Sequence, residues 1–186
     1  MGTRQAAAAR TRMSLIDAGL RLAERTGLSG LSINLLVEEA GVSKGTFFHH
    51  FGDRASYVLA LHREFHDRLL TEIEEATEGL RPGRERLAVA ANTYLDGCLR
   101  NRGVRALLLE ARADRVIADE IGARNASTAK LLRADFTAMK WPHPLESAQL
   151  WVGMTAEAAL LELTAGRRSP AVRAALKNFT YKGAER

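Results

Sequence analysis

A short segment near the N-terminus contains side chains that suit contact with nucleic acid: hydroxyl groups, a lysine, a histidine and an aromatic ring. These residues are Ser43, Lys44, Thr46, Phe48 and His49. The segment follows Gly41, and glycine accepts the positive φ that a tight turn between two helices requires. Two short helices joined by such a turn form a helix-turn-helix, whose second helix enters the major groove of DNA. The pattern predicts this motif between Ser32 and Arg54.

The predicted second helix of the motif has two different faces. Phe47 and Phe51 are one helical turn apart, so we expect both rings to point into the protein. The polar and basic residues then lie on the outer face. Ser32 and Ser43 are expected to cap the two helices at their N-termini. The alternative is an ordinary helical hairpin in a bundle, which would not require lysine, threonine and two histidines beside the turn.

Catalytic and metal-binding chemistry has little support in the sequence. Cys98 is the only cysteine and has no histidine near it in sequence, so we expect a buried or pocket-lining thiol. His62 and His66 have the spacing of a metal-binding pair, but no third ligand follows in a clear pattern, which favours a solvated helix face. No phosphate-binding loop or dinucleotide-binding glycine pattern is present. We expect no enzyme activity, no metal and no cofactor.

The charge of the chain is mildly basic. It has 186 residues, with 27 Lys and Arg against 22 Asp and Glu, a net charge of +5. Arg4, Arg10 and Arg12 precede the first acidic residue, Asp17, and suit either a DNA-contacting arm or a solvated tail. No apolar run approaches the roughly 18 residues that span a bilayer, and the N-terminus lacks the apolar core of a signal peptide. We expect a cytoplasmic protein without a membrane partner.

Hydrophobic periodicity predicts an all-α fold of about nine helices. The expected helices cover about residues 5–26, 33–40, 43–51, 54–78, 84–100, 104–111, 114–140, 145–165 and 170–181. Pro142 and Pro144 separate the seventh helix from the eighth. Ser169 and Pro170 suit the N-cap and first position of the ninth.

The stretch AGVSKGTFFHHF from Ala40 to Phe51, followed by Asp53 and Arg54, closely resembles the DNA-binding signature of the TetR family of repressors. The resemblance covers about residues 10–60. It implies an all-helical homodimer with a three-helix DNA-binding head and a larger body that binds a small molecule. The implied domains are residues 1–53, with the helix-turn-helix, and residues 54–186, for ligand binding and dimerisation.

The resemblance also implies roles for single residues. Ser32 stands where the family usually has a threonine that contacts phosphate, and Arg54 replaces a lysine while keeping its charge. Phe48 stands where tyrosine is commonest, so the phenolic hydrogen bond to phosphate is lost but an apolar ring remains. The expected DNA-contacting residues are Arg10, Ser32, Ser43, Lys44, Gly45, Thr46, Phe48, His49 and Arg54.

In the body, the resemblance implies an effector pocket and a dimer interface formed by the last two helices. The expected eighth helix is apolar on two sides, which is typical of a helix with two partners. For the interface we expect Leu150, Gly153, Ala158, Leu161 and Leu176. For the pocket we expect Phe65, Tyr94, Cys98, Leu107, Phe136, Trp151 and Met154, each of which would also suit the plain core. Candidate polar anchors are Asn92, Asp96, Glu110, Asn125 and Glu157.

The predicted function is a ligand-responsive transcriptional repressor. It would bind a double-stranded DNA operator as a homodimer and leave it when a small, mainly apolar effector of unknown identity binds. One alternative is an activator, or a regulator without an effector. The alternative from another class is a helical protein-interaction module with a degenerate DNA-binding head.

Overall fold

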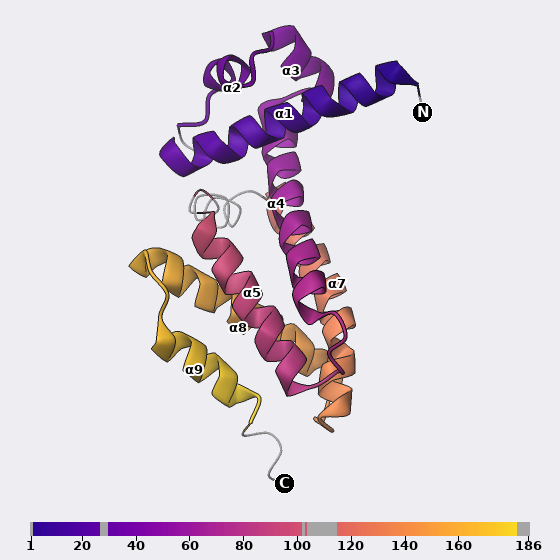
Figure 1. Cartoon of the computed structure of the whole chain (residues 1–186), viewed down its shortest axis with the longest axis vertical. Helices are drawn as coiled ribbons and strands as arrows, with labels where there is room; N and C mark the ends of the chain where they lie inside the picture. Colours follow the sequence, from indigo (N-terminus) through magenta and orange to yellow (C-terminus); the bar gives the residue numbers. More distant parts are fainter. Residues whose placement is uncertain (1, 27–29, 102, 104–114, 182–186) are drawn as a thin grey trace. The chain divides into compact units, whose positions relative to one another are not determined.

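The computed structural model of the chain describes residues 2–26, 30–101, 103 and 115–181. These residues form eight α-helices and no strand (Figure 1): α1 (Thr3–Thr26), α2 (Ile33–Ala40), α3 (Lys44–Phe51), α4 (Arg54–Thr77), α5 (Arg84–Arg100), α7 (Arg115–Ala138), α8 (Pro144–Ala165) and α9 (Pro170–Phe179). The all-α class predicted from the sequence is confirmed. The sixth predicted helix, at about residues 104–111, lies outside the described residues.

The chain divides into two compact units. The first, called the head here, comprises Met1–Asp67 and Asn101–Glu110; the second, the body, comprises Arg68–Arg100 and Ala111–Arg186. Helix α4 therefore begins in the head and ends in the body. The domain boundary expected after residue 53 stays a prediction.

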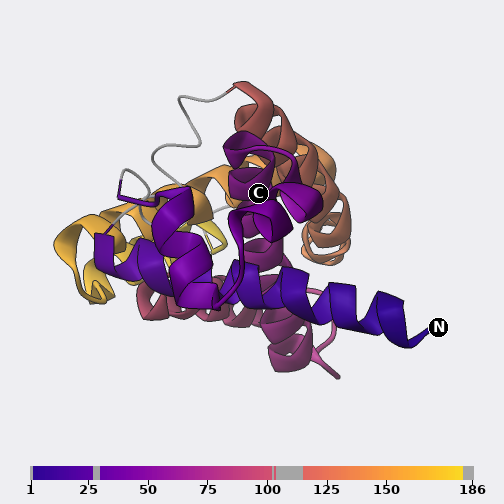
Figure 2. The same ribbon diagram turned by 90° about the horizontal axis from the view of Figure 1, so that it is seen from above.

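The head is built around α1, which packs against α2, while α2 packs against α3. Figure 2 shows the N-terminal end of α1, in indigo, extending beyond α2 and α3. Residues 2–10 of this extension are all exposed. The largest fully buried side chains of the head are Leu15, Ile16, Leu31, Leu36, Phe47, Tyr57 and Leu61. This core fixes the short helices of the predicted DNA-binding motif.

The body is organised around α8, which packs against α5, α7 and α9. Alanines at buried positions 148, 158 and 159 bring the backbone of α8 close to its neighbours, and Trp151 fills the space between them. Helix α9 begins as predicted: Ser169 is its N-cap, and its Oγ accepts a hydrogen bond from the N–H of Val172. Among the described residues, none of the helices could cross a membrane.

A buried arginine joins three helices of the body. Arg173 of α9 donates from Nε and Nη2 to the two carboxylate oxygens of Glu162 on α8, both at 2.8 Å. On α5, Asp96 lies 2.7 Å from the Nη2 atom of Arg173, and Asn92 accepts from Nη1 at 3.2 Å. The side chain of Glu162 is fully buried, so this network replaces its lost hydration. Asn92 and Asp96, considered as ligand anchors, thus hold α9 in place.

Candidate DNA-binding interface

The turn between α2 and α3 has the geometry of a helix-turn-helix. Gly41 ends α2 in the left-handed region, with φ 65° and ψ 34°, and its N–H donates to the carbonyl groups of Val37 and Glu38. Residues with a Cβ atom avoid this region, so glycine suits the turn. The N–H of Val42 also donates to the Val37 carbonyl, over 2.9 Å. The turn chemistry predicted for Gly41 is confirmed.

Serine caps fix the starts of both helices. The Oγ of Ser32 accepts from the N–H of Leu35 at 3.2 Å, and the Oγ of Ser43 accepts from the N–H of Thr46 at 3.1 Å. The hydroxyl groups of Ser43 and Thr46 also lie 3.0 Å apart. One of the two hydroxyl groups donates its hydrogen to the other. The hydrogen of the second hydroxyl group remains available for a phosphate.

Helix α3 presents the two faces expected from its sequence. Phe47 and Phe51 are buried and pack around Tyr57 of α4, with ring centroids 5.1 Å and 4.8 Å from the Tyr57 ring. On the opposite face Lys44, Gly45, Phe48 and His49 are exposed, and Thr46 is half-buried. The helix contains no acidic residue. Its outer surface is therefore basic, polar and partly aromatic.

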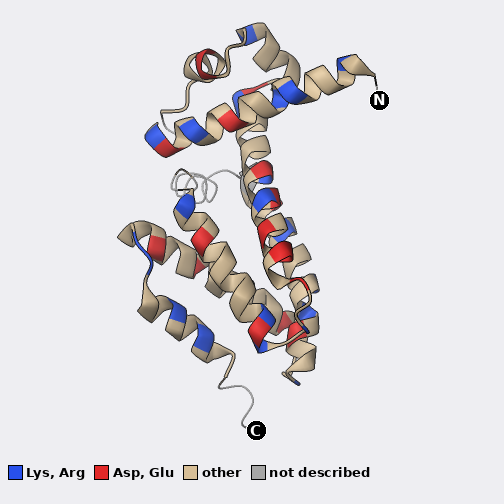
Figure 3. Cartoon of the chain, in the orientation of Figure 1, with Lys and Arg blue, Asp and Glu red and all other residues tan. Residues whose placement is uncertain are grey.

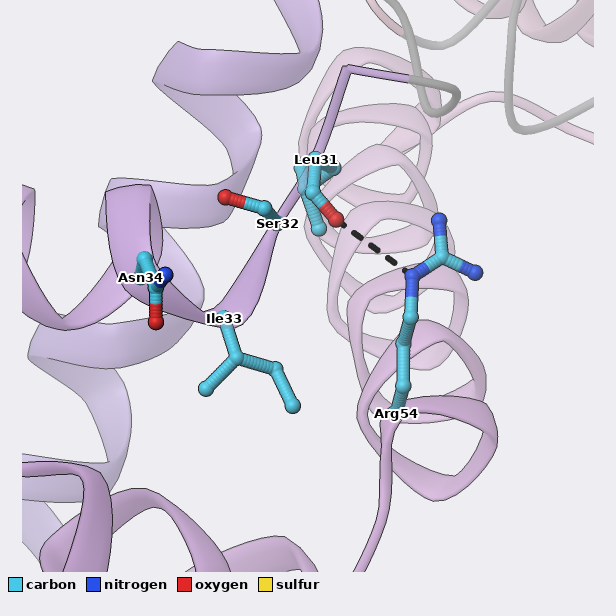
Figure 4. A pocket seen from close by; sticks show the side chains of 5 residues that line it. All are labelled: Leu31, Ser32, Ile33, Asn34 and Arg54. Carbon is cyan, nitrogen blue, oxygen red and sulfur yellow. Dashed lines mark hydrogen bonds between the residues drawn. The ribbon is translucent and has the colours of Figure 1, made fainter.

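A shallow pocket of about 440 Å³ lies at the N-terminus of α2. Figure 4 shows its lining residues, which are Leu31, Ser32, Ile33, Asn34 and Arg54. The Nε atom of Arg54 donates to the carbonyl oxygen of Leu31 at 3.3 Å, and its terminal nitrogens point away from that carbonyl. Exposed helix N–H groups and a guanidinium together favour an anion. The fold thus brings together the two residues expected to contact phosphate.

Asp53 caps the helix on which Arg54 lies. Its Oδ1 atom accepts from the N–H of Ser56 at 2.7 Å and so caps α4. Hydrogen bonds from the Ser56 backbone and side chain lower the pKa of the Asp53 carboxyl group. The cap fixes the first turn of α4, where Arg54 is the first residue.

The acidic residue Glu39 on α2 forms ion pairs with two arginines of α1. Its carboxylate accepts from Arg25 at 2.6 Å and from Arg21 at 3.1 Å. Hydrogen bonds from Arg25 and then Arg21 lower the pKa of Glu39. The pairs link α1 to α2 and neutralise a charge that would otherwise repel phosphate.

The N-terminal part of α1 adds basic residues to the head. Figure 3 shows Lys and Arg spaced along α1. Arg10 lies in the first half of this helix and is exposed. The guanidinium of Arg12 lies over the Phe51 ring, 5.1 Å from its centroid. Burial, followed by the charges of His49 and Arg12, lowers the pKa of His50. The segment is helical, and its first residues are exposed, so a DNA-contacting arm and a solvated segment both stay predictions.

The residues expected to form the effector pocket are distributed over both units. Phe65 is a buried residue of the head, whereas the body holds Tyr94 and Cys98 on α5, Phe136 on α7, and Trp151 and Met154 on α8. The rings of Phe136 and Trp151 have centroids 6.5 Å apart. Burial raises the pKa of the Cys98 thiol to about 12. Leu107 lies outside the described residues, and the pocket assignment stays a prediction.

The residues expected at the dimer interface differ in exposure. Leu150 is 70% exposed and Leu161 52% exposed, and Gly153 is exposed between them on α8. Ala158 and Leu176 are buried within their own chain. The first three residues are therefore available to a partner, whereas the other two contribute to packing inside the body.

The histidine pair on α4 is not a solvated helix face. His62 is 1% exposed, and its ring centroid lies 4.4 Å from that of the half-buried His66. The expectation of solvent exposure is therefore wrong for His62, because it lies on the side of α4 that carries buried Leu61 and Phe65. No cluster of three or more potential metal-ligating side chains occurs among the residues that the structure describes.

Two parts of the pocket at the N-terminus of α2 were not predicted from the sequence. The backbone carbonyl of Leu31 orients Arg54, and the exposed Asn34 lines the opening. A backbone acceptor has no sequence signature. The position of Asn34 just after a serine N-cap is a usable signal, because the first turn of a helix offers unpaired N–H groups.

Part of the head matches known proteins in sequence. Residues 15–61 match the family model described as bacterial regulatory proteins, tetR family. The chain is 34% identical over 65 residues to the HTH-type transcriptional repressor AcnR of Corynebacterium efficiens, and equally to that of Corynebacterium glutamicum. These alignments span 35% of this chain and 35% of the length of each relative.

The fold as a whole resembles solved transcriptional regulators. A transcriptional regulator from Rhodococcus sp. Rha1 has a TM-score of 0.78 at 23% identity, covering 94% of this chain and 98% of that one. Reduced NemR from E. coli has a TM-score of 0.71 at 19% identity, covering 91% and 96%. Head and fold define an all-helical protein of the helix-turn-helix class. The helix-turn-helix region matches the TetR family model, and the fold is that of solved transcriptional regulators.

Proposed function

We propose that this protein is a transcriptional repressor that binds operator DNA through its head. The observation that carries the proposal is the outer face of α3, which is basic, free of acidic residues and fixed by Gly41 and Ser43. A helix of this kind suits the major groove. Lys44, with the hydroxyl groups of Ser43 and Thr46, supplies phosphate contacts beside the groove.

The pocket at the N-terminus of α2 is the second proposed anchor. A phosphate there would accept hydrogen bonds from the Ser32 region and from the guanidinium of Arg54. Such contacts fix the orientation of a protein on the duplex without reading sequence. Arg10, on the exposed first half of α1, is proposed to approach the phosphate backbone of the DNA beside the operator.

The protein is proposed to bind DNA as a dimer with a second copy of the same chain. The outward face of α8 carries Leu150, Gly153 and Leu161, and α9 adds Phe179, which is 56% exposed. Large exposed apolar side chains on two neighbouring helices are typical of a protein interface. A two-fold dimer would present two α3 helices to two half-sites one helical turn of DNA apart.

A small, mainly apolar effector is the proposed signal that weakens operator binding. The candidate contacts in the body are the aromatic residues Phe136 and Trp151 together with the half-buried Tyr94 and the buried Cys98 of α5. Coupling must be reciprocal, so an effector that lowers operator affinity must itself bind more weakly to the DNA complex. A regulator of this kind would act in the cytoplasm.

A gel shift with DNA flanking the protein's own gene tests the proposed function. We expect a salt-sensitive, sequence-specific shift and a footprint with two half-sites. Arg54→Ala should weaken binding to specific and non-specific DNA alike, whereas Arg133→Ala, an exposed arginine of α7, serves as the matched control. Absence of any shift, with the protein folded, would favour a protein-interaction module.

Dimer formation is tested by sedimentation. Leu150→Glu combined with Leu161→Glu should convert the protein to a monomer and abolish two-site footprints. Leu131→Glu, at a leucine of α7 that is 60% exposed, is the matched control and should leave the dimer intact. A double variant that still sediments as a dimer would place the interface elsewhere.

A further inference from the structure

The last turn of α3 carries two adjacent histidines beside an arginine of α1. The rings of His49 and His50 meet at 68°, with centroids 5.4 Å apart. The guanidinium of Arg12 lies 5.1 Å from the centroid of the Phe51 ring, and the Phe51 and His50 rings have centroids 6.3 Å apart. Histidine is the side chain whose ordinary pKa places its charge change between pH 5 and pH 8. This junction of α1 and α3 therefore contains groups that can gain protons near neutral pH.

The two histidines differ in their surroundings. His49 is exposed on the outer face of α3, whereas His50 is half-buried. Burial lowers the pKa of His50, and the positive charges of His49 and Arg12 lower it further. All three effects disfavour a proton on this ring. In the protein without DNA, His50 is therefore neutral at pH 7.

The other charged groups near this junction are engaged in contacts of their own. On α2, Glu39 is bound by two arginines of α1, and Glu38 is exposed. At the start of α4, the carboxylate of Asp53 accepts a hydrogen bond from the helix backbone, and the Nε atom of Arg54 donates to a backbone carbonyl. The charges that act on His50 are thus positive ones.

A bound duplex would reverse the electrostatic balance at this junction. DNA that lies along the outer face of α3 brings a row of phosphates towards the last turn of the helix, and negative charge nearby favours the protonated form of histidine. The C-terminal end of a helix favours a cation as well. The phosphates would also offset the repulsion between His50 and Arg12. The DNA complex should therefore hold a proton that the free protein does not hold.

We propose that operator binding by the head is coupled to the uptake of a proton at His50, so that acid favours the DNA complex. The proposal rests on the proposed function, because it requires α3 to lie against DNA. Coupling is reciprocal: if DNA favours the proton, the proton favours DNA by the same factor. The head would then release its operator more readily as the pH rises from 6 to 8.

The test measures operator affinity by fluorescence anisotropy between pH 6 and pH 8 at constant ionic strength, with the full-length protein. We expect the affinity to fall as the pH rises, by up to about tenfold for each head, the factor that corresponds to one unit of pKa. The Cε1–H resonance of His50, followed by NMR in the free protein and in the complex, should titrate at a higher pH in the complex.

Three variants assign the proton to one residue. His50→Gln cannot gain a proton, so its affinity should become nearly independent of pH. Arg12→Gln removes a repulsive charge, so the midpoint of the pH dependence should move to higher pH whatever happens to the affinity itself. His143→Asn, at an exposed histidine between α7 and α8, is the matched control and should keep the full pH dependence.

Each result supports the coupling or overturns it. Specific binding by the wild-type protein with equal affinity at pH 6 and pH 8 would overturn it and leave the proposed function intact. A pH dependence that persists in His50→Gln but disappears in His49→Gln would assign the proton to the exposed histidine instead. If the wild-type protein binds no operator at any pH, the proposed function itself is contradicted, and the proton coupling with it.

Discussion

The hydroxyl group of Tyr57 lies directly against the backbone of Gly19, where a Cβ atom would overlap it. From this position it donates a 2.7 Å hydrogen bond to the carbonyl of Leu15. The same Tyr57 ring packs against Phe47 and Phe51 of α3. Helix α1 therefore positions α3 through a tyrosine of α4, and the contact depends on the missing side chain of Gly19.

Gly19→Ala should destabilise the head. The added methyl group would displace Tyr57 and its neighbour Leu61, and overpacking of this kind costs about 1–3 kcal/mol. Thermal unfolding followed by circular dichroism measures the loss, and DNA affinity should fall with it. Gly122→Ala is the matched control, because a Cβ atom there meets no neighbour. It should stabilise α7 by about 0.5–1 kcal/mol. Equal effects of the two substitutions would contradict the close contact.

Glu162→Gln should weaken the attachment of α9. Burial acts to raise the pKa of Glu162, but hydrogen bonds from Arg173 and from the Ser169 backbone outweigh it, and the pKa lies below the usual 4.5. The substitution leaves a buried guanidinium with Asp96 as its remaining carboxylate, so we expect a loss of about 2 kcal/mol in urea unfolding at pH 7.

The pH dependence gives an independent check on this pair. A lowered pKa in the folded state means that the carboxylate of Glu162 stabilises the protein above about pH 4.5, the value without the shift. This contribution disappears as the pH falls through the folded-state pKa. The difference between wild type and Glu162→Gln should therefore shrink in acid. A difference that grows below pH 4.5 would contradict the ion pair.

Lys140→Gly should stabilise the body. Lys140 follows α7 with φ 59°, and the N–H groups of Lys140 and Trp141 donate to the carbonyls of Thr137 and Phe136, as at a glycine C-cap. Glycine relieves the strain of the left-handed conformation, a gain of about 1 kcal/mol. Lys140→Ala separates loss of the lysine side chain from relief of strain, and should give no gain. The melting temperatures of the three proteins decide the question.

Cys98 should resist thiol reagents in the folded protein. The side chain is fully buried, and burial raises its pKa to about 12, so the reactive thiolate is scarce at neutral pH. Because the chain has one cysteine, labelling with a disulfide reagent reports this site alone. We expect slow labelling in buffer and rapid labelling in denaturant. Rapid labelling of the folded protein would instead indicate a reactive thiol.

Local sequence signals predicted the head well. Gly41, Ser32 and Ser43 act on the backbone within a few residues, so their capping and turn roles follow from sequence spacing alone. The inward phenylalanines followed from helical periodicity in the same way. Ends of most helices were predicted within two residues for this reason.

Long-range relationships could not be predicted in this way. His62 was expected to face solvent because its own helix gives no sign of what covers it, yet it is buried. The contact of Arg54 with the Leu31 carbonyl joins distant parts of the chain through a backbone atom. Ala158 and Leu176 read as interface residues but are buried within their own chain, because small and branched apolar side chains suit both environments.

The central claim is that the outer face of α3 binds DNA. The most direct test is the salt dependence of operator affinity for wild type and for Lys44→Ala, measured by fluorescence anisotropy. The logarithm of the affinity falls as the logarithm of the salt concentration rises, and a lysine that neutralises one phosphate should make this slope steeper by about 0.9. The account predicts weaker binding of Lys44→Ala to all DNA sequences and a slope reduced by about one. Identical affinity and slope in the two proteins would contradict it.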